Sequence, residues 1–443
     1  MGGNQRVASI ELLRRNLNKA SPRRLVRLLG PLSPRAFFGV IQSLNRPEAL
    51  VRELREEDFY YLTKALSEEE ALQLLSLAST KQLQHCADLE FWKKDMLYSD
   101  GIAKWLDIFA QLPIDQVQDL LTTLDPELLV AMLHPFLTVK TRNADVDYVE
   151  ESDTLPAYTL EDVFYVDFPA PSLEDSLKAL LEALYEADTN YYFTVMESLA
   201  CGLSSDFEEA ALHFRRARLA EKGFPCFEEA LEIYQDSGVR HILAASPVAP
   251  RDVESPQYDD PDAAPLAYPL KTIPATSLFR QCLDQLSDSQ DRDRISSELA
   301  HLANKIIVAD SLDPSLYEDL TKSLRKASGY INIALQELGD GEPAAATDLL
   351  INRHIETLFR YGFQSILSLR REAMTFVRKY EGGIENLGYP LATILRELFK
   401  KRPLFAANVR GESKPRDFQD REEIIYIRRL LDDSSLEQAW EDV

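Results

Sequence analysis

The segment 215–234 carries charged side chains whose types and spacing are suited to chemistry. Arginines come first, and a Gly-Phe-Pro break at 223–225 separates them from a second helical run rich in glutamate. Two helices meeting at such a break form either an ion-paired corner or a pocket for a charged ligand. If a small-molecule site exists, we expect it here, and the candidate ligand-binding residues are Arg215, Arg218, Glu221, Glu228 and Glu232.

A metal site is the second chemical candidate. Glu209 and His213 are four residues apart, so they share one helical face and provide half of a metal-binding pair. Residues 145–210 also contain seventeen carboxylates and a single basic residue, Lys178. This acidic segment is either a solvated face that keeps the protein soluble or a weak Mg²⁺ or Ca²⁺ site, because hard cations take oxygen ligands. It contains no Asp-x-Asp-x-Asp-Gly loop.

Known catalytic motifs are missing from the sequence. It contains no Gly-x-Ser-x-Gly elbow, no Gly-x-x-x-x-Gly-Lys loop and no Gly-x-Gly-x-x-Gly turn. The four cysteines, Cys86, Cys201, Cys226 and Cys282, form no pair at the spacing of a metal or redox motif. The sequence therefore predicts no catalytic residue and no cofactor, which argues against an ordinary enzyme.

The elements that would position these residues are helices with regularly spaced starts. Ser-Pro, Arg-Pro, Glu-Glu, Ser-Glu and Ser-Thr pairs recur every ten to thirteen residues between 21 and 80. Proline fits the first helical position and the preceding serine can cap the free amides, so each pair predicts a helix start. Helices of about three turns are unstable alone in water, so we expect neighbours to stack into a superhelical array. After a break at Asp100-Gly101, two further units follow.

The strings at 121–133 and 66–75 resemble known repeats. Leu-Asp-Pro-Glu-Leu-Leu in the first and Leu-Ser-Glu-Glu-Glu-Ala-Leu in the second are similar to the short-helix repeats of the MgtE magnesium-transporter N domain and of flagellar motor switch proteins. The resemblance covers residues 20–137. It implies a superhelical stack of short helices, and such surfaces commonly bind other proteins.

We expect an all-α chain with five segments. Residues 138–172 break the helical pattern and suggest a short strand or extended segment, and the run from Ile351 to Val377 predicts one long central helix near the C-terminus. The segments are a basic N-terminal arm (1–19), a helical-repeat domain (20–137), an acidic helical middle region (138–235), a proline-rich linker (236–276) and a C-terminal helical domain (277–443).

Composition restricts the partners. The 49 basic and 73 acidic residues give a formal charge of -24, which argues against wrapping around nucleic acid or an anionic membrane. Basic residues of the C-terminal domain lie near aromatics at core spacing, which also argues against a nucleic-acid surface. The sequence contains no run of eighteen apolar residues, so it predicts no membrane span. Together with the scattered cysteines, these features predict a cytoplasmic protein.

A second resemblance extends over the whole chain. The string from Arg218 to Tyr234 and the later Arg402-Pro403-Leu404-Phe405 resemble an uncharacterised bacterial family of all-helical proteins of about this size. This resemblance implies no activity. From the repeats and the missing catalytic motifs we expect a scaffold or regulatory protein that binds another protein. The alternative is a sensor of a ligand or divalent cation, or an unrecognised enzyme, acting through the 215–234 corner.

Overall fold

A computed structural model describes residues 17–142, 154–201, 204–235, 266–380 and 383–441. Helices dominate these residues, and the expectation of an all-α protein is confirmed. The chain forms two compact units. Among the described residues, unit 1 contains those up to 221 together with 313–317, and unit 2 contains 222–235, 266–312 and those from 318 onwards. The expected repeat segment and most of the expected middle region therefore share one unit.

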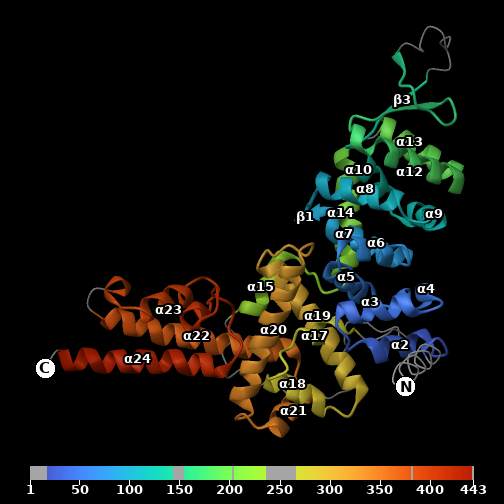
Figure 1. The fold of residues 1–443 in the computed structure, drawn as a ribbon. Helices are drawn as coiled ribbons and strands as arrows, with labels where there is room; N and C mark the ends of the chain where they lie inside the picture. Colours follow the sequence, from blue (N-terminus) through green and yellow to red (C-terminus); the bar gives the residue numbers. More distant parts are fainter. Residues whose placement is uncertain (1–16, 143–153, 202–203, 236–265, 381–382, 442–443) are drawn as a thin grey trace, which may run out of the picture. The chain divides into compact units, whose positions relative to one another are not determined.

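Unit 1 begins with a succession of short helices (Figure 1). Those from α2 to α7 each start at one of the predicted pairs. Proline opens α2, α3, α4 and α10, and Ser67 and Ser79 close complete capping boxes with Glu70 and Gln82. The helices are α2 (Pro22–Leu29), α3 (Pro34–Ser43), α4 (Pro47–Val51), α5 (Glu56–Ala65), α6 (Glu68–Leu75), α7 (Thr80–Glu90), α8 (Ser99–Ala110), α9 (Ile114–Thr123) and α10 (Pro126–Leu133).

Two buried glutamines join helices of this succession in the same way. Gln82, the third residue of α7, donates through Nε2 to the carbonyls of Val51 and Leu54, each at 2.8 Å. Gln116, the third residue of α9, donates to the carbonyls of Leu75 and Ala78 at 2.8 and 3.1 Å. In each case the first acceptor is the last residue of a helix, α4 or α6, and the second acceptor lies three residues later. The Val51 and Leu75 carbonyls also accept from the backbone amides of Leu54 and Ala78, so each glutamine adds a second hydrogen bond at a helix end. We call this arrangement the glutamine clasp.

The predicted break at Asp100-Gly101 is wrong, because both residues lie in the first turn of α8. The interruption comes earlier, in a hairpin of β1 (Trp92–Lys93) and β2 (Met96–Leu97). Glycine did not mark a loop here, because Gly101 packs closely against the end of α7, where a Cβ would lie 2.7 Å from the carbonyl oxygen of Glu90.

The extended segment expected at 138–172 is confirmed. Strands β3 (Thr138–Thr141) and β4 (Phe164–Asp167) pair antiparallel, with Val139 opposite Val166. A single 3-10 turn, η2 (Pro171–Leu173), leads into the acidic helices α12 (Glu174–Ala187), α13 (Thr189–Cys201) and α14 (Ser204–Glu221). Helix α12 packs against α8 and α9, and α14 packs against α10.

A loop from late in the chain completes unit 1. Residues 313–317 belong to this unit although they connect two helices of unit 2. The Tyr60 hydroxyl of α5 lies between Glu90 Oε1 at 2.8 Å and the carbonyl oxygen of Pro314 at 3.0 Å. The neighbouring Tyr61 hydroxyl lies 3.1 Å from that of Tyr317, and the two rings pack with centroids 5.4 Å apart. The loop is therefore part of the packing around α5.

Unit 2 contains the longest helices of the described chain, α19, α20, α22 and α24, together with shorter ones. Its helices are α15 (Phe227–Leu231), η3 (Glu232–Tyr234), α17 (Tyr268–Lys271), α18 (Leu278–Gln285), α19 (Ser289–Ala309), α20 (Tyr317–Leu338), α21 (Pro343–Asn352), α22 (Ile355–Lys379), η4 (Ile384–Asn386), α23 (Leu391–Leu398), η5 (Ala407–Arg410) and α24 (Arg421–Glu441). The single helix predicted from Ile351 is divided, because α21 ends at Asn352 and α22 begins at Ile355. A helical period continues across the break, so periodicity alone did not reveal it.

Helices α20 and α22 approach each other closely at Gly362. A Cβ atom built on this residue would lie 2.7 Å from the carbonyl carbon of Tyr330 and 3.0 Å from its Cα, with the carbonyl oxygen nearer still. Both contacts are to backbone, which cannot rotate away. Glycine at this position therefore sets the distance between the two central helices.

Some expectations fall outside the described residues. They include most of the basic arm, the acidic residues 145–153 and residues 236–265 of the proline-rich segment. Within the described residues, none of the helices combines the length and apolar character that crossing a membrane requires.

Candidate functional site

Helix α14 carries the predicted arginines and uses them within unit 1. Arg218 forms a bidentate pair with Asp88 of α7, at 2.8 Å for both Nε and Nη2, and its Nη1 lies 2.5 Å from Asp125. Asp88 is only 1% exposed, so this ion pair is largely shielded from water. Burial disfavours the Arg218 cation, but the two aspartates outweigh burial and raise its pKa. The residue joins α7, α14 and the start of α10.

Arg215 is the second member of this cluster. Its Nε donates to the backbone carbonyl of Asp88 at 2.7 Å, and its guanidinium lies 5.3 Å from the centroid of the Trp92 ring. Burial lowers the pKa of Arg215 to about 10, against the attraction of Asp88 and Asp95. At neutral pH the side chain remains a cation, stabilised by a carbonyl and an aromatic face.

The predicted glutamates are distributed over both units. Glu221 is the last residue of α14 in unit 1, whereas Glu228 in α15 and Glu232 in η3 are exposed residues of unit 2. The aspartates that pair with Arg218 are distant in sequence, and the spacing did not predict them. Ligand binding at the five predicted residues stays a prediction.

The metal candidates lie on α14. Glu209 and His213 occupy successive turns, and the His213 ring packs against Phe214 with centroids 5.9 Å apart. Among the described residues, no group of three or more histidine, cysteine, aspartate or glutamate side chains could hold a metal ion. A cation at this pair or at the acidic segment stays a prediction.

Unit 2 contains a buried cluster of charges that the sequence did not reveal. Lys326 of α20 is 3% exposed, and its ammonium lies 2.6 Å from Asp310 Oδ2 and 3.5 Å from Asp417 Oδ1. Arg402 Nε donates to the other oxygen of Asp310 at 3.1 Å. Two cations therefore face two carboxylates. We call these four residues and the tyrosines described next the Lys326 cluster.

Two tyrosines close the Lys326 cluster on its aromatic side. The Tyr234 hydroxyl donates to Asp310 Oδ2 at 3.1 Å, and the Arg402 guanidinium lies 3.6 Å from the centroid of the Tyr234 ring. Tyr330 is fully buried, and no partner hydrogen-bonds its hydroxyl within the described chain. Both tyrosine rings pack against the same two rings of α22, those of Phe359 and Phe363.

Burial and charge set the protonation of the Lys326 cluster. Burial raises the pKa of both tyrosines, so their hydroxyls are neutral. Burial alone would lower the pKa of Lys326, but Tyr330, Asp417 and Asp310 together raise it and keep the ammonium charged. Burial also raises the pKa of Asp417, assisted by Asp310 and opposed by Lys326. The positive and negative charges of the Lys326 cluster thus compensate one another in a region that contains little solvent.

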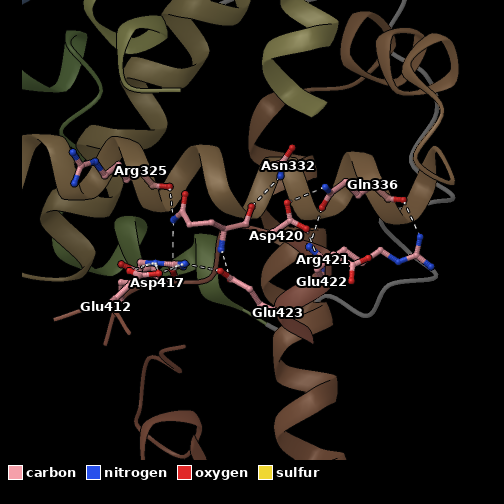
Figure 2. A network of polar contacts seen from close by, with 11 residues as sticks. Arg325, Asn332, Gln336, Glu412, Asp417, Asp420, Arg421, Glu422 and Glu423 are labelled. Atoms are coloured by element: carbon pink, nitrogen blue, oxygen red, sulfur yellow. Dashed lines mark hydrogen bonds and ion pairs between the residues drawn. The ribbon is translucent and has the colours of Figure 1, made fainter. Parts of the chain in front are cut away.

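A polar network holds the segment that carries Asp417 against α20 (Figure 2). The Gln419 amide donates to the Arg325 carbonyl at 3.1 Å, and the Asn332 amide donates to the Gln419 carbonyl at 2.9 Å. Further along, the Gln336 side chain accepts from the backbone amide of Arg421 at 2.9 Å. These bonds fix both the Asp417 segment and the first turn of α24 on one helix.

The Lys326 cluster joins segments that are far apart in sequence. Tyr234 ends one string of the family resemblance and Arg402 begins the other, and the two side chains stack. One signal in the sequence could have pointed to the cluster, since Lys326 stands among the buried residues Leu324 and Ala327 on the apolar face of its helix. The described geometry is that of an internal ion-pair centre that fixes five segments, and it contains no metal-binding group.

The fold and these two clusters define an all-α protein of two units, each fixed internally by buried ion pairs. The model of the Family of unknown function (DUF6178) matches residues 14–440. The chain belongs to this family, which confirms the expectation of an uncharacterised family. No curated protein and no solved structure matches the chain. The resemblance to the MgtE N domain therefore has no support from these comparisons.

Proposed function

We propose that this protein is a cytoplasmic helical scaffold that binds another protein through unit 1. The observation that carries the proposal is the glutamine clasp, which occurs twice with the same register. A recurring joint between short helices is what a repeat array requires, because no such helix can bury its apolar stripe alone. The free thiol state of all four cysteines fits a reducing compartment.

Exposed apolar side chains on unit 1 supply contact points for the partner. Leu28 on α2 is 60% exposed, Met96 in the hairpin 71% and Ile114 at the start of α9 53%. Each could be made polar without disturbing the core, since each side chain is already largely in water. Burying such a side chain against a partner is favourable by about 25 cal/mol for each Å² of apolar surface removed from water.

The test compares co-purification from native cytoplasm using the full chain and two variants. The first variant combines Leu28→Ser, Met96→Ser and Ile114→Ser. The matched control is Tyr389→Ser, which removes a 75% exposed aromatic side chain from unit 2. We expect one protein to bind the wild-type chain and the control in fixed stoichiometry, and to be lost from the triple variant.

Two results would count against the proposal. One is the recovery of the same proteins with the wild-type chain and the triple variant. The other is loss of the partner from the Tyr389→Ser control alone, which would place binding on unit 2. Thermal melts of all three proteins show whether each variant is folded, and we expect melting temperatures within about 2 °C of one another because exposed substitutions change stability little.

A further inference from the structure

A groove of about 520 Å³ lies between α22 and α24 in unit 2. Helix α24 runs alongside α22 (Figure 1). The two helices are parallel, since Tyr361 lies near Arg421 and Glu372 pairs with Arg428 further along both helices. The residues lining the groove are Glu372, Thr375, Phe376, Lys379, Arg428, Leu431 and Asp432. A groove between parallel helices is the shape that further helices fill in a bundle.

The charges of each wall are arranged in opposite order. Along α22 the order is acidic Glu372, then Phe376, then basic Lys379. Along α24 it is basic Arg428, then Leu431, then acidic Asp432. Glu372 and Arg428 already pair within the chain at 2.8 and 2.9 Å. Lys379 and Asp432 are exposed, and neither forms an ion pair with any described residue. One end of the groove thus holds the Glu372–Arg428 ion pair, and the other holds the exposed charges of Lys379 and Asp432. Like Glu372, Asp432 attracts Arg428, one turn earlier on α24, and helps to raise the pKa of that arginine.

We propose that a second copy of this chain occupies the groove, related to the first by a two-fold axis. The axis we propose lies in the interface, perpendicular to α22 and α24, so it sets each helix antiparallel to its counterpart. A two-fold interface uses the same patch on both copies, so this surface must be complementary to itself. Turning α22 about a point between residues 375 and 376 brings Glu372 opposite the partner copy's Lys379. Turning α24 about residue 430 brings Arg428 opposite the partner copy's Asp432.

The rotation centres of α22 and α24 lie close enough together for one two-fold axis to relate both helices to their counterparts. Because Glu372 pairs with Arg428, the midpoint between residues 375 and 376 of α22 lies beside the midpoint between residues 431 and 432 of α24. The rotation centre of α24, at residue 430, is therefore one and a half residues away from that of α22 along the groove. At 1.5 Å per residue this is an offset of roughly 2 Å, within the reach of arginine and aspartate side chains. Each end of the dimer groove then holds four alternating charges, and Phe376 and Leu431 lie between the ends. The product is a four-helix arrangement of two α22 and two α24 helices.

The test measures the mass of the full chain by sedimentation and light scattering over a range of concentrations. We expect a dimer of twice the 50.4 kDa chain mass. Lys379→Glu sets like charges against Glu372 at both ends, so we expect the dimer dissociation constant to rise at least about tenfold. The control is Lys81→Glu, an exposed lysine of unit 1, which should leave the constant unchanged.

Exchanging the charges at positions 372 and 379 distinguishes the loss of a contact between copies from the misfolding of a variant. Glu372→Lys should also weaken the dimer, and an equimolar mixture of the Lys379→Glu and Glu372→Lys proteins should form a heterodimer, because opposite charges then face each other at both ends. A wild-type chain that stays monomeric overturns the proposal. A dimer that Lys379→Glu leaves unchanged, or a mixture that fails to associate, overturns it as well.

Discussion

Replacing Gly362 with alanine tests how closely α20 and α22 must pack. In an open helix this change should stabilise the chain by about 1 kcal/mol, because alanine restricts the unfolded backbone and glycine does not. Here the new Cβ would lie 2.7 Å from the Tyr330 carbonyl carbon, well inside the contact distance of about 3.5 Å. One helix must therefore retreat by roughly 1 Å, which forfeits a quarter to a half of each affected contact.

The clash should outweigh the gain in helix propensity. Overpacking of a buried contact costs about 3 kcal/mol when the obstacle is backbone. Subtracting about 1 kcal/mol for propensity leaves a net loss of about 2 kcal/mol, a roughly thirtyfold change in the ratio of folded to unfolded chain. The rings of Phe359 and Phe363 separate from Tyr330 in the same movement.

The assay is urea unfolding followed by circular dichroism, combined with hydrogen exchange. Because the chain has two compact units, a single transition is not assured, so the exchange of α20 and α22 amides supplies the local free energy. Gly39→Ala in α3 is the matched control, since a Cβ there meets nothing within 4 Å. We expect this control to stabilise α3 by about 0.5–1 kcal/mol. If both variants were stabilising, the close-approach argument would be refuted.

Three further predictions concern the ion pairs. Lys326→Met leaves Asp310 and Asp417 without their central cation, so we expect the free energy of unfolding, measured in urea, to fall by about 3–5 kcal/mol. For the control, exposed Lys81→Met, we expect a loss of less than about 0.5 kcal/mol. Burial raises the pKa of Asp417 in the folded chain, so its ionisation costs stability that is regained as pH falls through that pKa. Asp417→Asn should therefore be the more stable protein at pH 7, by a margin that shrinks as the pH is lowered towards about 3.9, the ordinary aspartate pKa of the unfolded chain. A margin that stays constant down to that pH would contradict this linkage. Arg218→Lys loses the bidentate geometry towards Asp88 and should cost about 1–2 kcal/mol, and unchanged exchange of α7 amides would argue against that role.

Local signals predicted much of the fold. The helix starts of unit 1 depend on proline and capping residues within one turn, and those interactions do not need the rest of the chain. The extended segment was recognisable because its apolar pattern changed. The break between α21 and α22 was missed because the helical period continues through it, and Gly101 was misread because it packs closely against the end of α7 and does not mark a loop.

Long-range pairing could not be predicted in the same way. The arginines of α14 stand out in the sequence, but Asp88 lies 130 residues from Arg218 and looks like any polar residue of its own helix. The Lys326 cluster brings together Tyr234, which precedes α20 in the sequence, and Asp417, which follows it. Such a centre exists only after the helices have packed, so a single sequence without aligned relatives shows one hint of it, a lysine on an apolar face.

The loop 313–317 links the order of synthesis to the order of folding. Unit 1 extends up to Glu221, but the Tyr61 hydroxyl lies against that of Tyr317, and the Pro314 carbonyl beside Tyr60 also comes from this segment, which is made much later. A ribosome releases the chain from the N-terminus, and domains generally fold as they emerge. The first unit must therefore wait, with α5 incompletely covered, until residue 317 has been synthesised. A chain cut after Glu221 would keep the short helices but would never receive this final piece.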